Sequence, residues 1–392
     1  MSSLEMMPSH LVGERLRQAR EGADVTQAAA GKAIDVARTT IVAIEKGERK
    51  IRLGELQKLA QLYRTSVNAL LRQESVHVDL VPRFRKLPGK GVEAERAAEL
   101  MASLAKAEVE LENLLGVIRP ASLPPERPLL NGDVNVQAEN DASELRQRLG
   151  LGLAPIPNLV SVLEMDMGVR VYVRRLPPTI SGLFAFDDAI GACILLNANH
   201  PRERRNNSAA HETGHLIATR QKPEVLHSGE EENSREERYA NAFARALLTP
   251  ARAVMQKFAD VTAGADKLTR KHIIVLANYF LVSREAMVRR IEELGLTKRG
   301  TWDWFEANGG ITDEQVRQVL GDQFVQDEAK AEADRPTTLR LNLLSAEAVR
   351  RDLLSEGQLA RLLHLDRVDL RALLDAYNTD ADEVDGDFQR LG

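Results

Sequence analysis

Apolar residues recur every three or four positions through most of the chain, which is the spacing of helices with one buried face. Between residues 9 and 74 the pattern divides into five short blocks separated by polar turns, which predicts a compact unit of five helices. A longer block follows from Glu93 to Leu115, and short helical blocks continue from about residue 262 to residue 377. The pattern therefore predicts a mainly helical protein.

The middle of the chain adds a small number of strand patterns. Val169 to Val173 is rich in β-branched residues, and Leu183 to Phe186 and Ala192 to Leu196 flank the turn sequence Asp187 to Gly191, which is typical of a hairpin. Helices are expected around these strands at Ser143–Leu149, Pro157–Met165 and Asn207–Ile217. The predicted fold class is mainly α with a small antiparallel β-sheet, that is, α+β.

Composition limits the kind of protein that these elements can form. A chain of 392 residues with 43% hydrophobic residues is large enough for two or three domains with cores. Its one cysteine, Cys193, excludes an intramolecular disulfide and a cysteine-rich zinc site. No run approaches 18 apolar residues and the start lacks a secretion signal, so we expect a cytoplasmic protein without membrane contact.

The segment from residue 9 to residue 74 carries many basic side chains, although the net charge of the chain is −5. Any contact with nucleic acid is therefore expected to be local to this segment. Its characteristic residues are Leu16, Arg20, Thr26-Gln27-x-x-Ala30, Arg38-Thr39-Thr40-Ile41-x-x-Ile44-Glu45-Lys46-Gly47 and Leu56-x-x-Leu59-Ala60. With these residues the segment resembles the XRE/Cro family of helix-turn-helix regulators.

The resemblance implies a five-helix DNA-binding domain whose partner is a double-stranded DNA operator. Arg38, Thr39 and Val42 would face base edges in the major groove. Gln27 and Lys46 would hold phosphate or base at the helix ends. The alternative is a helical protein-interaction module with a solvated basic face.

Residues 75–139 contain a long helix and a linker. The apolar residues of the helix alternate steps of three and four, which forms an a/d seam of about two and a half heptads: Ala97, Leu100, Leu104, Ala107, Leu111 and Leu114. The seam predicts either a homodimer or a helix packed against its own chain. Pro120, Pro124, Pro125 and Pro128 then predict a linker of about 20 residues.

His211, Glu212 and His215 form an H-E-x-x-H motif in the predicted domain of residues 140–260. Residues four apart lie on one face of a helix, so both imidazoles can point at one metal ion. Glu212 beside them is placed to act as the catalytic base of a zinc-dependent hydrolase. Two further residues, His227 and Tyr239, are weak candidates for stabilising an oxyanion, and each is more often a surface or packing residue.

A catalytic zinc ion usually has three protein ligands, so one more is expected. Glu237 lies on a downstream helix pattern beside an apolar face, and Glu236 is the competing ligand although it points about 100° away. Asn241 lies one turn after Glu237 and could hydrogen-bond a ligating histidine. We therefore favour His211, His215 and Glu237 as the ligands of Zn²⁺.

The two motifs together resemble the ImmA/IrrE family of gluzincin-type metallopeptidases over about residues 140–255. The likeness rests on Gly182, Asn197, Arg204-Arg205, Ala210-His211-Glu212-x-Gly214-His215 and Glu237-x-x-Ala240-Asn241-x-Phe243-Ala244-x-x-Leu247-Leu248-x-Pro250. The resemblance implies a bacterial zinc endopeptidase that cleaves a repressor-type protein, this chain among the candidates, and thereby releases stress-response or mobile-element genes. The chain departs from the family at Asn206-Asn207-Ser208, where a Phe is common, and at Thr249, where Met is usual.

Residues 261–392 contain two further helix-turn-helix-like patterns and many acidic residues, which disfavour phosphate contact. We interpret this region as a partner or regulatory module that ends in an acidic tail after Tyr377. The leading hypothesis is a DNA-binding regulator with a zinc endopeptidase domain. The alternative is a non-catalytic transcription factor or antitoxin-like protein that uses the peptidase fold as a sensor.

Overall fold

The computed structural model describes residues 9–23, 25–63, 70, 91–119, 122–222, 224–227, 234–321 and 338–377. The predicted fifth helix near Ser66 and the predicted acidic tail lie outside the described residues. The chain divides into two compact units: Met1–His77, Lys106–Arg119 and Leu343–Gly392 form one, and Val78–Ala105 and Pro120–Asn342 form the other. Within the described residues, no helix is long and apolar enough to cross a membrane.

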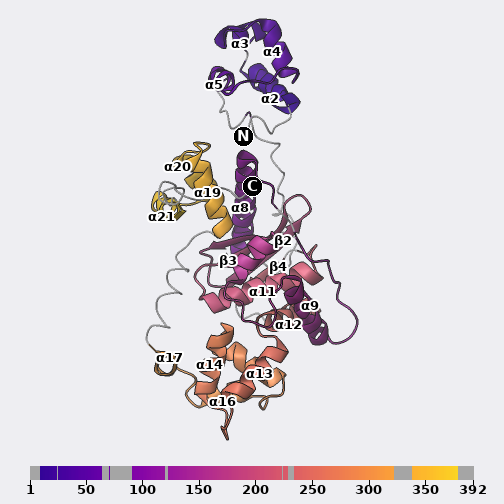
Figure 1. The fold of residues 1–392 in the computed structure, drawn as a ribbon, viewed down its shortest axis with the longest axis vertical. Coiled ribbons are helices and arrows are strands. Elements are labelled where there is room, and N and C mark those ends of the chain that lie inside the picture. The colour runs from indigo at the N-terminus through magenta and orange to yellow at the C-terminus, as the bar shows by residue number, and fades with distance from the viewer. Residues whose placement is uncertain are drawn as a thin grey trace, which may run out of the picture. The chain divides into compact units, whose positions relative to one another are not determined.

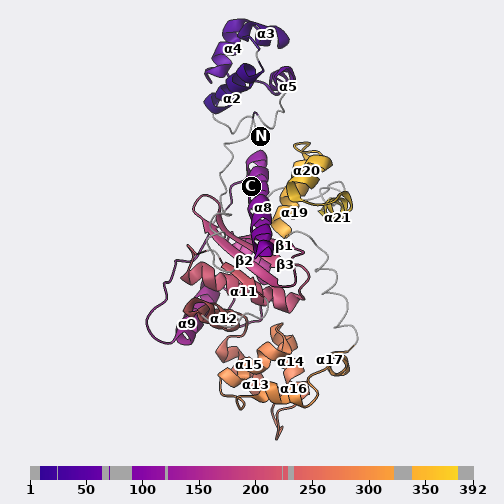
Figure 2. The same ribbon diagram turned by 180° about the vertical axis from the view of Figure 1, so that it is seen from behind.

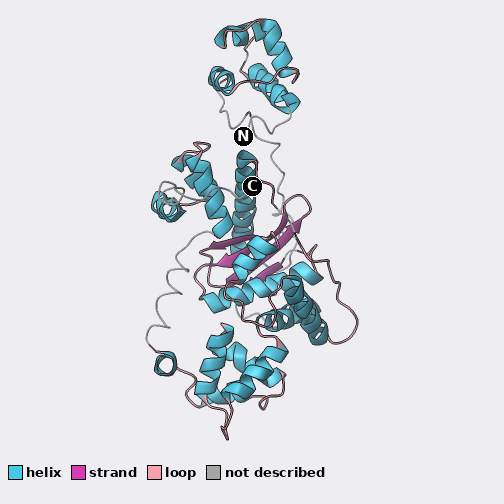
Figure 3. Cartoon of the chain, in the orientation of Figure 1, coloured by secondary structure: helices cyan, strands magenta, loops and turns pink. Residues whose placement is uncertain are grey.

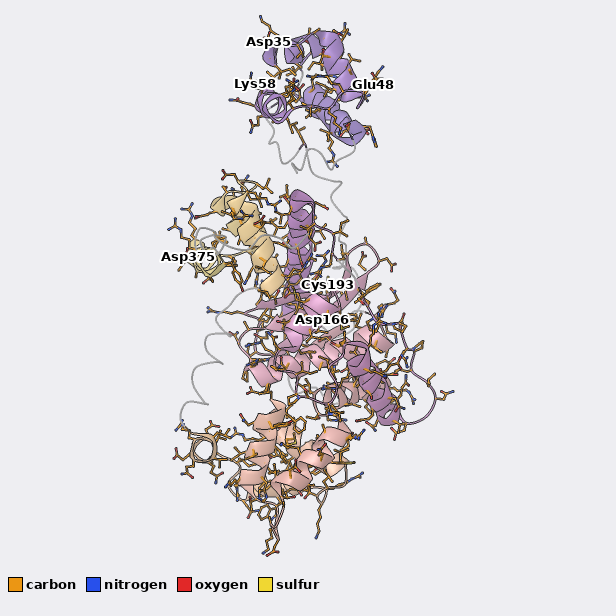
Figure 4. All side chains as sticks on the ribbon, in the orientation of Figure 1. Asp35, Glu48, Lys58, Asp166, Cys193 and Asp375 are labelled. Atoms are coloured by element: carbon orange, nitrogen blue, oxygen red, sulfur yellow. The ribbon has the colours of Figure 1, made fainter. Side chains whose placement is uncertain are left out.

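The N-terminal helices are α2 (Ser9–Gly22), α3 (Gln27–Ala33), α4 (Arg38–Glu45) and α5 (Leu53–Leu62). The hydroxyl of Thr26 accepts a hydrogen bond from the backbone N–H of Ala29 and so caps α3. Asp35, which is labelled in Figure 4, adopts a left-handed φ of 58° at the turn between α3 and α4. The helices close over a shared core that includes Leu16, Ile41 and Leu56. These elements confirm the predicted helix-turn-helix arrangement.

The long helix α8 (Val92–Leu115) forms where the sequence predicts it. Of its seam residues, Leu100 is half-buried, and these are buried within the single chain: Ala97, Leu104, Ala107, Leu111 and Leu114. A seam that is already covered favours packing against the same chain over pairing with a second copy. The homodimer therefore stays a prediction without support from this helix.

The second unit contains a four-stranded sheet in the order β1-β3-β2-β4. Its strands are β1 (Arg170–Arg174), β2 (Ile180–Asp187), β3 (Gly191–Asn197) and β4 (Glu224–His227). The hairpin of β2 and β3 is antiparallel as predicted, but β1 pairs with β3 in parallel. The expectation of a wholly antiparallel sheet is wrong, because β1 lies beside the returning strand of the hairpin instead of the outgoing one. Figure 3 shows how small this sheet is beside the helices, so the α+β class with mainly helical content is confirmed.

Two short helical segments precede β1: α10 (Leu159–Ser161) and a π-helix, η1 (Val162–Asp166). Helix α9 (Val134–Arg148) begins nine residues before the predicted Ser143, within the segment expected to be a linker. The cause is Asp133, whose carboxylate accepts from the backbone N–H of Asn135 and caps the helix. The segment before it, residues 122–132, contacts α11, because the backbone N–H of Arg127 donates to the carbonyl of Ile217 at 2.7 Å.

Helix α11 (Arg202–Ala218) packs on β2 and β3, and α12 (Arg235–Leu248) packs between α11 and α9, as Figures 1 and 2 show from opposite sides. Buried Arg146 on α9 donates to the carbonyls of Leu247 at 2.5 Å and Gly152 at 2.8 Å. Burial lowers the pKa of Arg146 to about 10, which still leaves it charged near neutral pH. The arginine therefore ties the end of α12 to α9.

The remaining helices are α13 (Ala251–Val261), α14 (Arg270–Phe280), α15 (Arg284–Glu293), α16 (Thr301–Ala307), α17 (Asp313–Leu320), α19 (Leu339–Arg350), α20 (Glu356–Leu363) and α21 (Arg367–Tyr377). The predicted helix-turn-helix-like patterns correspond to α14–α15 and α20–α21. Each pair turns at a residue with left-handed φ, Leu281 at 56° and His364 at 53°.

Candidate metal centre and DNA-contact helix

The H-E-x-x-H motif lies in the second half of α11, where almost every residue is buried. The helix places His211 and His215 one turn apart, and their Nε2 atoms are 3.1 Å from each other. Both imidazoles and the Glu212 side chain are at most 2% exposed. The spacing predicted from the sequence therefore brings both ring nitrogens to one point.

Glu237 reaches the same point from α12. Its Oε2 is 3.3 Å from His211 Nε2, and its Oε1 is 3.4 Å from His215 Nε2. Ser234 caps α12 by accepting from the backbone N–H of Glu237 at 3.0 Å, which fixes the first turn that carries the carboxylate. The Glu237 side chain is 27% exposed, so the centre is open to solvent on this side.

The close packing of α11 on α12 depends on Gly214, which lies between the two histidines in the sequence. A Cβ at position 214 would lie 2.9 Å from the Cα of Ala240 and 3.3 Å from its Cβ. Any larger residue would have to push the helices apart, and Glu237 would move with α12. Glycine at this position therefore brings the three side chains within reach of one another.

The other ring nitrogen of each histidine has a hydrogen-bond partner. His211 Nδ1 is 2.8 Å from Asn241 Oδ1, the contact that the sequence suggested. His215 Nδ1 is 3.1 Å from the hydroxyl of Thr219, a partner that sequence reasoning missed. An amide oxygen accepts a hydrogen bond, and the Thr219 hydroxyl donates to the carbonyl of His215, so both Nδ1 atoms act as donors.

These tautomers direct the lone pairs of both Nε2 atoms toward Glu237. The two Nε2 atoms thus lie 3.1 Å apart, and each lies 3.3–3.4 Å from one oxygen of the Glu237 carboxylate. Zn²⁺ bonds of about 2.0–2.2 Å in a tetrahedral site place ligand atoms about 3.3–3.6 Å apart, so this group fits a zinc ion.

Glu212 points from α11 toward strand β2, where Gly182 leaves space for it. A Cβ at Gly182 would lie 3.0 Å from Glu212 Oε1 and 3.4 Å from the carbonyl of Leu195. A side chain at position 182 would therefore displace the Glu212 carboxylate. The strand thus contributes to the site through the absence of a side chain.

The competing candidates lie elsewhere. Glu236 forms an ion pair with Lys222 at 3.0 Å, and Tyr239 is buried with its hydroxyl donating to Asp141 Oδ2 at 2.8 Å. Tyr239 is therefore a packing residue and not an oxyanion candidate. His227 pairs with Ile180 through the backbone of β4, and its side chain lies outside the described part of the chain. Asn206 and Thr249, where the chain departs from the family pattern, are both buried.

The predicted DNA-contact residues lie on α3, on α4 and just after α4. Arg38, Thr39 and Lys46 are exposed, and Val42 is half-buried. The carboxamide of Gln27 donates from Nε2 to Glu45 at 2.9 Å and accepts from Arg38 Nε at 3.4 Å. Gln27 is therefore held by α4 in this structure, and its contact with DNA stays a prediction.

Sequence reasoning missed the ion pair beneath this helix. Arg20 Nε lies 2.6 Å from Glu45 Oε1, and both side chains are at most 10% exposed. The hydrogen bond with Glu45 is the main reason that the pKa of Arg20 is raised. The pair joins α2 to α4. Basic and acidic residues at these spacings are too common to single it out in advance.

Helix α15 belongs to the helix-turn-helix-like pair α14–α15, and its arginines pair with carboxylates of the same chain. Arg284 lies 2.9 Å from Asp313, Arg289 lies 2.8 Å from Asp303, and Arg290 lies 2.6 Å from Glu139. These partners leave little positive charge for phosphate. The observation agrees with the expectation that this region disfavours phosphate contact, whereas the role of the whole C-terminal region stays a prediction.

Comparisons with known proteins identify two family domains in the chain. Residues 16–70 match the model of the helix-turn-helix family, and residues 164–292 match the peptidase family model described as the IrrE N-terminal-like domain. The chain therefore joins an XRE-type helix-turn-helix domain to an ImmA/IrrE-like peptidase-family domain. It is a DNA-binding regulator with a peptidase-family domain.

Two other comparisons add little. The chain matches no curated protein sequence. Among solved structures, ComR from Streptococcus suis aligns over 94% of both chains with 11% sequence identity and a TM-score of 0.16. A likeness at this level supports no conclusion about fold or function.

Proposed function

We propose that the protein is a zinc endopeptidase that cleaves a repressor-type regulatory protein and that its helix-turn-helix domain binds an operator. The observation that carries this proposal is the convergence of His211, His215 and Glu237 within 3.4 Å, beside a buried glutamate. A zinc ion held by these residues would supply the positive charge that polarises a peptide carbonyl and acidifies water.

The chain's own residues have distinct roles in this proposal. Glu212 takes a proton from the attacking water and returns it to the nitrogen of the departing amine. Asn241 and Thr219 hold the two imidazoles with Nε2 directed at the centre. Gly182 keeps the space in which the Glu212 carboxylate lies.

The sheet offers one edge for an extended peptide. Among the described residues, β4 pairs only with β2, and it lies near α11. At the opposite edge, the Thr338 hydroxyl donates to the carbonyl of Val171 in β1 at 2.5 Å, so this carbonyl already has a partner. An extended substrate can add to an exposed strand through main-chain hydrogen bonds, so we place it along β4.

Cleavage of a repressor-type protein tests this function. The purified zinc-loaded protein should cut a helix-turn-helix repressor at a discrete site, which mass spectrometry of the fragments identifies. A strong chelator should stop the cleavage, and added zinc should restore it, because the three proposed ligands hold the ion reversibly. Cleavage that continues at the same rate after the zinc is removed would contradict the proposal.

The operator-binding part makes a separate prediction. Arg38→Ala should weaken binding to the preferred operator by about 1–3 kcal/mol if Arg38 reads a base edge, and selectivity at that base should fall. A mobility-shift titration of both proteins against operator and scrambled DNA measures this. Equal loss on both sequences would make Arg38 a phosphate contact, and no loss would remove it from the interface.

Because such a protein acts on the chromosome, a cytoplasmic location remains our prediction.

A further inference from the structure

The segment 122–132, which the sequence predicts to be a proline-rich linker, lies against both helices that carry the proposed zinc ligands. We call it the strap. It precedes α9 and lies outside residues 164–292, which match the peptidase family model. Its residues belong to the same compact unit as α11 and α12.

The strap completes the C-terminal end of α11. The last carbonyl groups of a helix have no partner within the helix. Here the backbone N–H of Arg127 donates to the carbonyl of Ile217 at 2.7 Å. Arg220 donates to the carbonyl of Leu216 at 3.1 Å and to that of Pro124 at 2.5 Å. These contacts fix the turn that follows His215.

The strap also reaches α12 on both sides of Glu237. Arg235, two residues before Glu237, donates to the carbonyls of Leu130 and Gly132. Tyr239, two residues after Glu237, donates to Asp141 Oδ2, and the Arg127 guanidinium lies 3.2 Å from Asp141 Oδ1. The same guanidinium contacts Glu144.

Arg127 therefore contacts both helices. Its backbone N–H bonds to Ile217 in α11, and its side chain pairs with Asp141, which accepts a hydrogen bond from Tyr239 in α12. The Tyr239 hydroxyl donates to Asp141 Oδ2 at 2.8 Å. The ion pair with Arg127 keeps Asp141 oriented to accept this hydrogen bond. A change at Arg127 therefore reaches the helix that carries Glu237.

We infer that Arg127 is a positioning residue that sets the distance of Glu237 from His211 and His215 and thereby the affinity for zinc. This inference rests on the proposed zinc centre. Partners that orient metal ligands typically change metal affinity by about 10–100-fold when they are removed, and Arg127 acts through Asp141 and Tyr239. We expect the lower end of that range.

The experiment compares Arg127→Ala, Arg127→Lys and a matched control, Arg289→Ala, in the full chain. The Arg289 side chain is slightly more exposed than that of Arg127, at 42% against 37%, and it also pairs with a carboxylate, at 2.8 Å. Zinc affinity is measured by competition with a chelator, and the thermal unfolding of the zinc-free proteins is measured in parallel. R127A should bind zinc about tenfold more weakly, R127K less so, and R289A as tightly as the wild type.

Tyr239→Phe keeps the packing of the buried ring but removes the hydroxyl that bonds to Asp141. Like R127A, it should therefore weaken zinc binding. R127A combined with Y239F should weaken it by less than the product of the two single effects, because both act through Asp141. A wild-type protein that binds no zinc overturns both the function and this inference. A wild-type protein that binds zinc no more tightly than R127A and Y239F overturns the inference alone.

Discussion

Glu212→Gln should lower the rate of substrate cleavage by at least about 100-fold, which is the usual contribution of a general base. Glutamine has the size of glutamate, so it fits the space against Gly182, but it cannot accept the proton of water. The zinc content should not change, because the three atoms that converge come from His211, His215 and Glu237. Single-turnover cleavage followed by mass spectrometry measures the rate.

The same variant separates the two hypotheses for the protein in cells. If proteolysis inactivates the repressor, a strain with E212Q should fail to induce the target gene while the protein still binds its operator. A sensor without turnover predicts unchanged induction. Cleavage by E212Q at the wild-type rate would contradict the proposed role of Glu212.

Gly214→Ala should disrupt the metal centre through packing and not through chemistry. The added Cβ would lie 2.9 Å from the Cα of Ala240, and neither backbone can yield as a flexible side chain would. Overpacking of this kind typically costs about 1–3 kcal/mol of unfolding free energy. Because Glu237 lies one turn before Ala240 on α12, zinc affinity should also fall, by about tenfold or more. Denaturant unfolding and chelator competition measure the two effects.

Gly357→Ala is the matched control. Gly357 also lies within a helix, α20, but a Cβ there meets no atom within 4 Å. Alanine favours a helix over glycine by up to about 1 kcal/mol, so this variant should be neutral or slightly stabilising, with unchanged zinc affinity. If G214A and G357A behaved alike, the close approach of α11 and α12 at Gly214 would not be what holds Glu237 near the two histidines.

Much of the fold could be predicted from local pattern. The helices of residues 9–62 and the hairpin of β2 and β3 follow from periodicity and turn chemistry, which act within a few residues. The parallel pairing of β1 with β3 could not be predicted, because strand order depends on contacts between distant parts of the chain. The early start of α9 depends on one capping residue, Asp133, which follows a segment rich in proline.

In the candidate site too, local features could be predicted and contacts between distant residues could not. The spacing of His211 and His215 is a property of one helix, so the sequence was sufficient for it. Placing Glu237 required a second motif and the geometry of its helix, and the structure brings this carboxylate to the histidines while Glu236 pairs with Lys222. Thr219 and Arg127 were missed because a lone threonine after a motif, and an arginine between prolines, carry no pattern in one sequence.

The most direct test of the central claim is the amount of zinc bound per chain. Purified wild-type protein, exchanged into metal-free buffer, should retain about one zinc ion per chain by elemental mass spectrometry, as a site with three protein ligands requires. Glu237→Gln should retain much less zinc. Glu236→Gln should retain as much zinc as the wild type, because Glu236 forms an ion pair with Lys222 and not with the histidines. A wild-type protein that holds no zinc after growth and dialysis in zinc, or an E237Q protein that holds as much as the wild type, would contradict the account.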